Sequence, residues 1–158
     1  MTVSRRTSGR VLALLGLLSL LLTGCGAEDQ APASSTAAAP EAEPDIDALL
    51  ANADLRRGQM LYFQCRACHS LNEGGPNKVG PNLWNMFGST AGFAPGFAYS
   101  DAFVNSDIVW TTETVSAWLH RPSRFLPGNR MVFVGVKDAQ DRANLIAFLQ
   151  QQTVPAAE

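Results

Sequence analysis

The sequence has few residues that bind metals or form disulfides: its 158 residues include three cysteines and two histidines. Cys65 and Cys68 form a C-x-x-C pair that is followed directly by His69, and no second C-x-x-C pair exists. A structural zinc site needs four ligands, in most cases all Cys or His. Because His69 lies directly beside Cys68, the two side chains are poorly placed to bind the same tetrahedral zinc ion. The other histidine, His120, stands at the end of an expected helix, where a cation suits the helix dipole, and is interpreted as a surface residue. The ligand supply therefore disfavours zinc.

The sequence also lacks strand-like alternation of polar and apolar residues, apart from the brief segment MVFVGV at 131–136. A thioredoxin-like thiol pair would follow a strand in a βαβ pattern, so that interpretation is disfavoured too. Residues that cap helices precede three segments with helical character. These caps are Asn52 or Asp54, Thr111 and Asp138. A stretch rich in Gly, Pro and Asn at 74–96 predicts a long loop, with a short helical turn around 83–87. The predicted class is all-α, with long loops that need a bound group in the interior to order them.

No apolar run reaches the roughly 20 residues that span a bilayer. The longest run, at 11–22, has twelve residues and follows three arginines, which is the pattern of a secretory signal peptide. It ends in the segment LTGC at 22–25, which resembles the lipobox of bacterial lipoproteins. That resemblance implies that residues 1–24 are removed and that Cys25 is acylated. The alternative is an ordinary signal peptide that is cleaved a little later.

The segment after the expected cleavage site contains no aromatic residue. Residues 25–45 are rich in Ala, Pro and acidic side chains, so they cannot bury enough apolar surface to offset the entropy of ordering them. This composition predicts a disordered tether. The globular domain is expected at 46–158, where nine acidic and nine basic residues make it formally neutral, and it contains no internal repeat.

The run C-x-x-C-H at 65–69 is the pattern at which c-type haem is attached to a chain. Three further segments follow it in order: KVGPNLWNMFGSTAGFAPGFAYSD at 78–101, RPSRFLPGNRMVFVGV at 121–136 and DRANLIAFL at 141–149. Together these segments closely resemble the class I c-type cytochromes, the group of mitochondrial cytochrome c and its soluble bacterial relatives. The likeness extends from Asp54 to about Gln151. It implies the class I cytochrome c fold, with three main helices and long loops around one covalent haem c.

The resemblance assigns roles to individual residues. Cys65 and Cys68 carry the thioether links, and His69 is the proximal iron ligand through Nε2. The backbone carbonyl of Pro81 accepts the other ring N–H of His69, which fixes the tautomer. Met131 is the distal ligand, because it stands in the family's Pro-Gly-x-x-Met motif. Met60 and Met86 lie on or near helical apolar faces, where methionine usually fills the core.

The resemblance also covers residues around these ligands. Tyr99 and Trp110 match positions that hydrogen-bond a haem propionate, and Asn129 stands where the family usually has a threonine that does the same. Gly58 and Phe148, with Tyr62, match the crossing of the first and last helices. Three positions depart from the family pattern: Ser89 replaces an arginine that helps to neutralise a propionate, Phe103 replaces an asparagine, and Trp118 replaces a tyrosine. The last two changes predict a drier distal side.

Two axial ligands leave no open position on the iron, so the resemblance implies a one-electron carrier rather than an enzyme. Expected donors are complexes of the quinol–cytochrome c reductase type, and expected acceptors are terminal oxidases or photosynthetic reaction centres. Two alternatives stay open: a haem enzyme with a labile methionine that acts as a peroxidase or binds small gases, and a fixed haem subunit of an oxidase or reductase. We expect a monomer with no nucleic-acid partner, held at a membrane in the bacterial periplasmic space through Cys25.

Partner binding is expected to use charge. Five basic residues lie in segments that border the haem in this family: Arg66, Lys78, Arg121, Arg124 and Arg130. They predict a positive face on a formally neutral domain. Complementary charge of this kind mainly speeds and orients encounter.

Overall fold

The computed structural model describes residues 44–154, and within them the secondary structure is helical. The helices are α1 (Ile46–Leu50), α2 (Leu55–Tyr62), α3 (Asp101–Val104), α4 (Thr112–His120), α5 (Pro122–Phe125) and α6 (Ala139–Thr153). Outside them, an isolated antiparallel bridge joins Thr90 to Val109. The all-α prediction is confirmed for this range. The expected signal peptide, Cys25 and the tether up to residue 43 lie outside the described residues.

The three predicted helices begin at the predicted caps. The Asp54 side chain accepts hydrogen bonds from the backbone of Arg56 and Arg57 at the start of α2. Thr111 forms a capping box with Thr114 at the start of α4. Asp138 accepts from the Asp141 backbone N–H at 2.8 Å at the start of α6. Each cap satisfies N–H groups that have no partner inside the helix.

Three short helices were not expected from the sequence. α1 is the one with a clear cap, because the Asp45 side chain accepts from the backbone of Asp47 and Ala48. It buries Ile46, which is 3% exposed. The expected helical turn at 83–87 was wrong: this segment forms turns, and Asn85 has a φ of 56°, a left-handed conformation that interrupts a right-handed helix.

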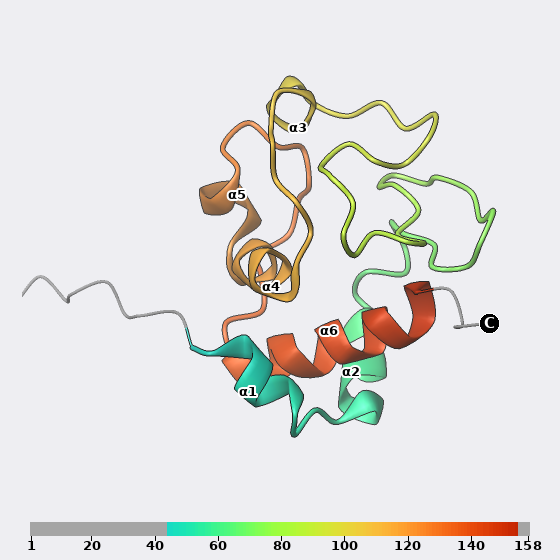
Figure 1. Ribbon diagram of the computed structural model, residues 1–158. Coiled ribbons are helices and arrows are strands. Elements are labelled where there is room, and N and C mark those ends of the chain that lie inside the picture. The colour runs from blue at the N-terminus through green and yellow to red at the C-terminus, as the bar shows by residue number, and fades with distance from the viewer. Residues whose placement is uncertain (1–43, 155–158) are drawn as a thin grey trace, which may run out of the picture. The chain divides into compact units, whose positions relative to one another are not determined.

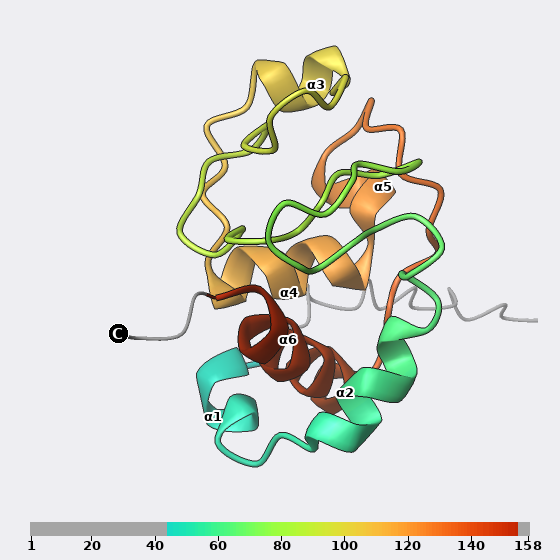
Figure 2. The ribbon, with the colours of Figure 1, turned by 90° about the vertical axis from the view of Figure 1, so that its right-hand side faces the viewer.

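The core lies where α6 crosses the other long helices. Figures 1 and 2 show α6 between α2 and α4, with α1 beside it. Gly58 on α2 permits the crossing, because a Cβ there would lie 2.8 Å from the Cβ of Phe148 and closer still to the Asn144 backbone. The Tyr62 and Phe148 rings pack with centroids 5.6 Å apart. The predicted crossing is confirmed, and it places the end of α2 beside α6.

A buried arginine joins α6 to the chain that follows α5. Arg142 is 2% exposed, and its guanidinium donates to the Ser116 hydroxyl on α4 at 3.0 Å. It also donates to the backbone carbonyls of Val136 and Lys137. These bonds fix the end of segment 126–136, which forms one wall of the site described below. No helix within residues 44–154 has both the length and the apolar character needed to cross a bilayer.

Candidate cofactor-binding site

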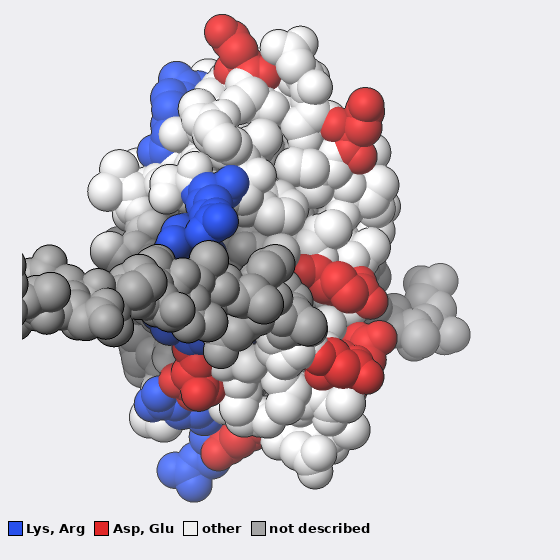
Figure 3. All heavy atoms as spheres, turned by 90° about the vertical axis from the view of Figure 1, so that its left-hand side faces the viewer, with Lys and Arg blue, Asp and Glu red and all other residues white. Residues whose placement is uncertain are grey.

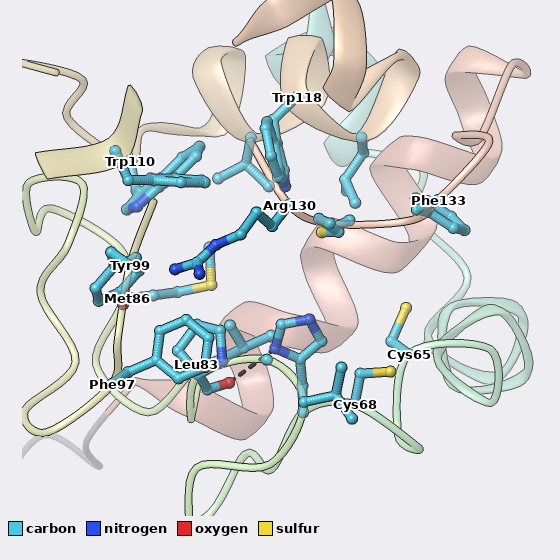
Figure 4. Close-up of a pocket in the computed structure, with 18 of the residues that line it drawn as sticks. Cys65, Cys68, Leu83, Met86, Phe97, Tyr99, Trp110, Trp118, Arg130 and Phe133 are labelled. Atoms are coloured by element: carbon cyan, nitrogen blue, oxygen red, sulfur yellow. Dashed lines mark hydrogen bonds between the residues drawn. The ribbon is translucent and has the colours of Figure 1, made fainter. Parts of the chain in front are cut away.

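A cavity of about 480 Å³ lies between the helices and the long loops. α4 and α6 form part of its wall, and the rest comes from the turn after α2, the loop at 79–100, Phe103 on α3, Trp110 before α4 and the segment at 130–133. Figure 4 shows that aromatic side chains surround much of it. Seven of the eight predicted cofactor-binding residues line the cavity: Cys65, Cys68, His69, Pro81, Tyr99, Trp110 and Met131. Folding therefore brings together residues that are as much as 66 positions apart in the sequence.

The two cysteines lie on a tight turn that directly follows α2. The backbone N–H groups of Cys68 and His69 both donate to the Cys65 carbonyl, at 2.9 and 3.0 Å. Both thiols are free. Burial, together with the neighbouring Cys68, raises the pKa of Cys65 to about 11. Among the described residues, no cluster of three or more Cys, His, Asp or Glu could hold a metal ion.

The ring of His69 is oriented by its neighbours. Its Nδ1 lies 2.7 Å from the Pro81 carbonyl, as the dashed line in Figure 4 marks. A carbonyl can only accept, so Nδ1 carries the proton and Nε2 keeps its lone pair. Burial lowers the pKa of His69, the Lys78 charge lowers it further, and the hydrogen bond to Pro81 works in the opposite direction. The neutral ring is the form that can bind a metal through Nε2.

Close packing also fixes this ring. A Cβ on Gly80 would lie within 2.8 Å of both ring nitrogens of His69. The His69 backbone carbonyl accepts from the Tyr62 hydroxyl at 2.9 Å and from Lys78 Nζ at 3.3 Å. The imidazole thus packs against Gly80, where no larger residue fits. The backbone of His69 is held by its bonds to Tyr62 and Lys78.

Met131 lies on another wall of the cavity, just after the turn at 127–130. Gly128 in this turn has a φ of 86°, which favours glycine. The Met131 backbone N–H donates to the side-chain oxygen of Asn129 at 2.9 Å. Met86 lines the same cavity and is 6% exposed. The structure therefore offers two thioethers to the cavity, whereas the sequence pattern singled out one.

Asn129 is the predicted residue that the structure places elsewhere, because it is not part of the cavity lining. Its side-chain nitrogen donates to the backbone carbonyls of Pro122 and Leu126, at 3.0 and 2.7 Å. Both of its N–H groups then have acceptors in α5 or directly after it. In this structure Asn129 shapes the turn before Met131 and does not donate into the cavity.

The departures at 103 and 118 make one wall aromatic. The Phe103 and Trp118 rings pack edge to face with centroids 5.4 Å apart, and Trp110 packs edge to face on Trp118 at 5.8 Å. Tyr99 adjoins this group through Phe103, at 5.6 Å. Phe103 contributes no hydrogen-bonding group to this wall, and the drier distal side stays a prediction. Burial raises the pKa of Tyr99, whose hydroxyl accepts from the Ala94 backbone.

Ser100 was not anticipated from the sequence. This residue lines the cavity, and its hydroxyl is buried without a hydrogen-bond partner in the described part of the chain. Leaving a buried hydroxyl unpaired costs about 1–3 kcal/mol. Its position next to Tyr99 is the signal that could have found it. Tyr99, Ser100 and Trp110 together bring polar hydrogen-bonding groups to an otherwise apolar cavity.

The chemistry of the lining fits a haem. Two thiols on one turn and an imidazole with a free Nε2 match the attachment and ligation that c-type haem requires. The aromatic and aliphatic walls suit the flat apolar macrocycle. With haem bound, the unpaired Ser100 hydroxyl would be available as a donor to a haem carboxylate.

Comparisons with known proteins agree with this site. The family model described as "Cytochrome c" matches residues 55–153, which contain every residue of the cavity lining. The cytochrome c of Theileria parva is 42% identical over 111 residues, which are 70% of this chain and 96% of the relative. The cytochrome c of Chlamydomonas reinhardtii is 44% identical over 101 residues, 63% of this chain and 90% of the relative. The cytochrome c2 of Blastochloris viridis is 45% identical over 98 residues, 62% and 77% of the two chains.

Proposed function

The chain belongs to the cytochrome c family, and from that premise we propose that it carries single electrons between membrane redox complexes, with His69 and Met131 as the ligands of its iron. Proteins of this family bind haem c covalently and transfer electrons, so this chain is an electron-transfer protein with haem c as its cofactor and is not an enzyme. Bound haem supplies a one-electron iron couple. In this chain Cys65 and Cys68 form the thioether links. The observation that carries the proposal is the cavity itself, which brings the C-x-x-C-H turn and Met131 together.

The ligand pair decides what the site can do. His69 presents Nε2 from a ring that Pro81 and Gly80 hold still. Met131 offers a soft, neutral thioether, which favours ferrous iron and raises the reduction potential relative to a second histidine. With His69 and Met131 holding the iron of a bound haem, no ligand position would remain for a substrate. The apolar lining keeps water away, which also favours the less charged ferrous state.

The distal ligand can be tested because two methionines line the cavity. We expect Met131→Ala to lose the ferric absorption band that reports methionine ligation, and its ferrous form to bind carbon monoxide readily. Met86→Leu is the matched control, since it removes the other thioether and keeps an apolar side chain of similar size. It should retain the wild-type spectrum. Loss of the band in Met86→Leu but not in Met131→Ala would assign the ligand to Met86, and a wild type that binds the gas as readily as Met131→Ala would overturn the carrier proposal.

Docking to redox partners is proposed to use the basic side chains near the haem. On the face shown in Figure 3, Lys and Arg side chains lie toward one edge of the view, while most Asp and Glu side chains lie toward the centre or the opposite edge. Two apolar side chains of the cavity rim, Val79 and Val132, are also highly exposed. Such a surface suits an acidic docking site on a reductase, an oxidase or a reaction centre, where charge steers the encounter.

This docking proposal predicts a dependence on salt. Raising ionic strength shortens the Debye length to about 3 Å at 1 M, so the bimolecular rate of electron transfer to an isolated acidic partner should fall. Arg121→Glu should lower that rate at low salt and weaken its salt dependence. If the rate does not change with salt in either protein, charge does not steer docking and this part of the proposal is wrong.

The location of the protein is a further part of the proposal, and it rests on the sequence. Acylation of Cys25 would hold the haem domain at a membrane in the periplasmic space, because two or more acyl chains anchor a protein stably. Residues 26–45 would then set its reach. We expect wild type in the membrane fraction and Cys25→Ser in the soluble periplasmic fraction. A wild-type protein recovered as soluble, with no lipid mass on its N-terminus, would make it an ordinary secreted carrier.

A further inference from the structure

Arg130 is the one lysine, arginine, aspartate or glutamate among the described residues that line the cavity. Figure 4 shows its side chain reaching into the cavity from the chain beside Met131, with the guanidinium on the side where Tyr99 and Met86 lie. A guanidinium stays charged throughout the physiological pH range. Arg130 therefore gives an otherwise uncharged, largely apolar cavity a fixed positive charge.

The opposite loop holds this guanidinium in place. One of its terminal nitrogens donates a hydrogen bond to the backbone carbonyl of Ala98, the residue before Tyr99. The bond joins two loops that are 32 residues apart in sequence. It uses one N–H of a group that has five. The charge is thus positioned next to Tyr99 and Ser100 while the group keeps further donors.

Position 89 gives the cavity no such charge. The resemblance implied an arginine at this position, whereas this chain has Ser89. The Ser89 hydroxyl donates to the Asn85 carbonyl at 2.8 Å. Its own carbonyl accepts from the Trp110 backbone at 2.9 Å, yet Ser89 is not part of the cavity lining. A short side chain bonded to its own turn therefore brings no positive charge to the cavity.

We propose that Arg130 supplies the positive charge that balances a haem propionate in this chain, in place of the arginine missing at position 89. The inference rests on the proposed function, since it requires haem in the cavity. A carboxylate placed in an apolar site needs a paired charge or hydrogen bonds. Tyr99, Ser100 and Trp110 are neutral, so they can supply only hydrogen bonds. Arg130 supplies the charge, and its positive field near the iron favours the ferrous form.

The test is the reduction potential of the haem-loaded protein, measured by redox titration. Arg130→Gln should shift the potential to more negative values, several times further than Arg56→Gln, a control that removes the same charge from α2, outside the cavity lining. Arg130→Lys keeps the charge and should retain most of the wild-type potential. The methionine-ligation band and far-ultraviolet circular dichroism are recorded for each variant, so that loss of Met131 ligation or of the fold is recognised.

A second charge at position 89 sharpens the test. Ser89→Arg should restore much of the lost potential in the Arg130→Gln protein and change wild type far less, because the two positions would serve one carboxylate. Equal shifts in Arg130→Gln and Arg56→Gln would overturn the proposal and leave Arg130 as a bridge between loops. So would a Ser89→Arg effect of the same size in both backgrounds. A wild-type protein without covalent haem would instead count against the proposed function.

Discussion

Around α6 the chain packs against itself: Ala143, Leu145 and Ile146 have no exposed surface, and α1, α2 and α4 all contact this helix. Across the cavity, residues 74–100 contain no helix, and Met86 and Ala94 are the buried residues of that range. Two side chains on the cavity rim, Val79 and Val132, are almost completely exposed, at 82% and 102%. The helical part of the domain (α1, α2, α4 and α6) forms a core from its own side chains. The loop part (residues 74–100) arranges its side chains around the cavity, so its order depends on what fills the cavity.

The largest expected effect comes from removing the haem. A cavity costs about 24 cal/mol per Å³, so a void of about 480 Å³ costs on the order of 10 kcal/mol. That is comparable to the whole net stability of a typical domain, about 5–15 kcal/mol. We expect the double variant Cys65→Ser, Cys68→Ser to lack covalent haem and to lose its cooperative thermal transition. Leu145 and Leu149 also line the cavity, so the helical part should unfold as well.

Hydrogen exchange can separate the two parts in that variant. Amides in the loop at 74–100 should lose protection completely, and those of α6 should keep at most a small remainder. A haem-free protein that unfolds cooperatively, with the loop amides still protected, would contradict this expectation. The loop part would then be ordered by its own contacts and not by what fills the cavity.

A smaller effect is expected from Gly58→Ala, which acts on the helical part. The added Cβ would meet Phe148 at 2.8 Å and the Asn144 backbone closer still, so α2 and α6 must move apart. Overpacking of this kind costs roughly 3 kcal/mol. Gly74→Ala is the matched control in the loop part, with open space around the Cβ and a φ of 64°, and should cost about 1 kcal/mol.

Denaturant titration of both haem-loaded glycine variants measures this difference. Equal losses of unfolding free energy would mean that the α2–α6 contact adapts easily. In that event the helical part would be less tightly packed than the buried residues of α6 indicate.

The smallest effect is expected from the ion pair between α2 and α6. Arg57 Nε donates to Asp141 at 2.8 Å, and this pairing lowers the pKa of Asp141. A depressed pKa adds stability above the pKa of the unfolded state, near 4 for aspartate, and that stability disappears as the pH falls through the folded value. Asp141→Asn should therefore cost little at neutral pH, since exposed pairs contribute little.

The pH dependence identifies the source of this small effect. The difference in unfolding free energy between wild type and Asp141→Asn should shrink as the pH falls below the unfolded-state pKa of aspartate, near 4. A difference that stays constant with pH would assign the loss to packing instead of charge.

Much of the helical part could be predicted from the sequence, because its determinants are local. Asp54, Thr111 and Asp138 cap helices through side chains that reach only two or three residues ahead. The C-x-x-C-H run needs one turn to present its groups, and the family segments follow it in order. α1 escaped prediction because five residues carry too little periodicity.

The tertiary structure decided the rest of the site, because contacts across the cavity leave no local pattern. The sequence alone did not show that Met86 shares the cavity with Met131, or that Ser100 has an unpaired hydroxyl there. Asn129 donates back to Pro122 and Leu126, which the family motif could not reveal. Arg130 is exposed, as expected of a surface charge, and its guanidinium also bonds Ala98, 32 residues earlier. A motif specifies which residues are present, whereas the folded loops determine which atoms meet.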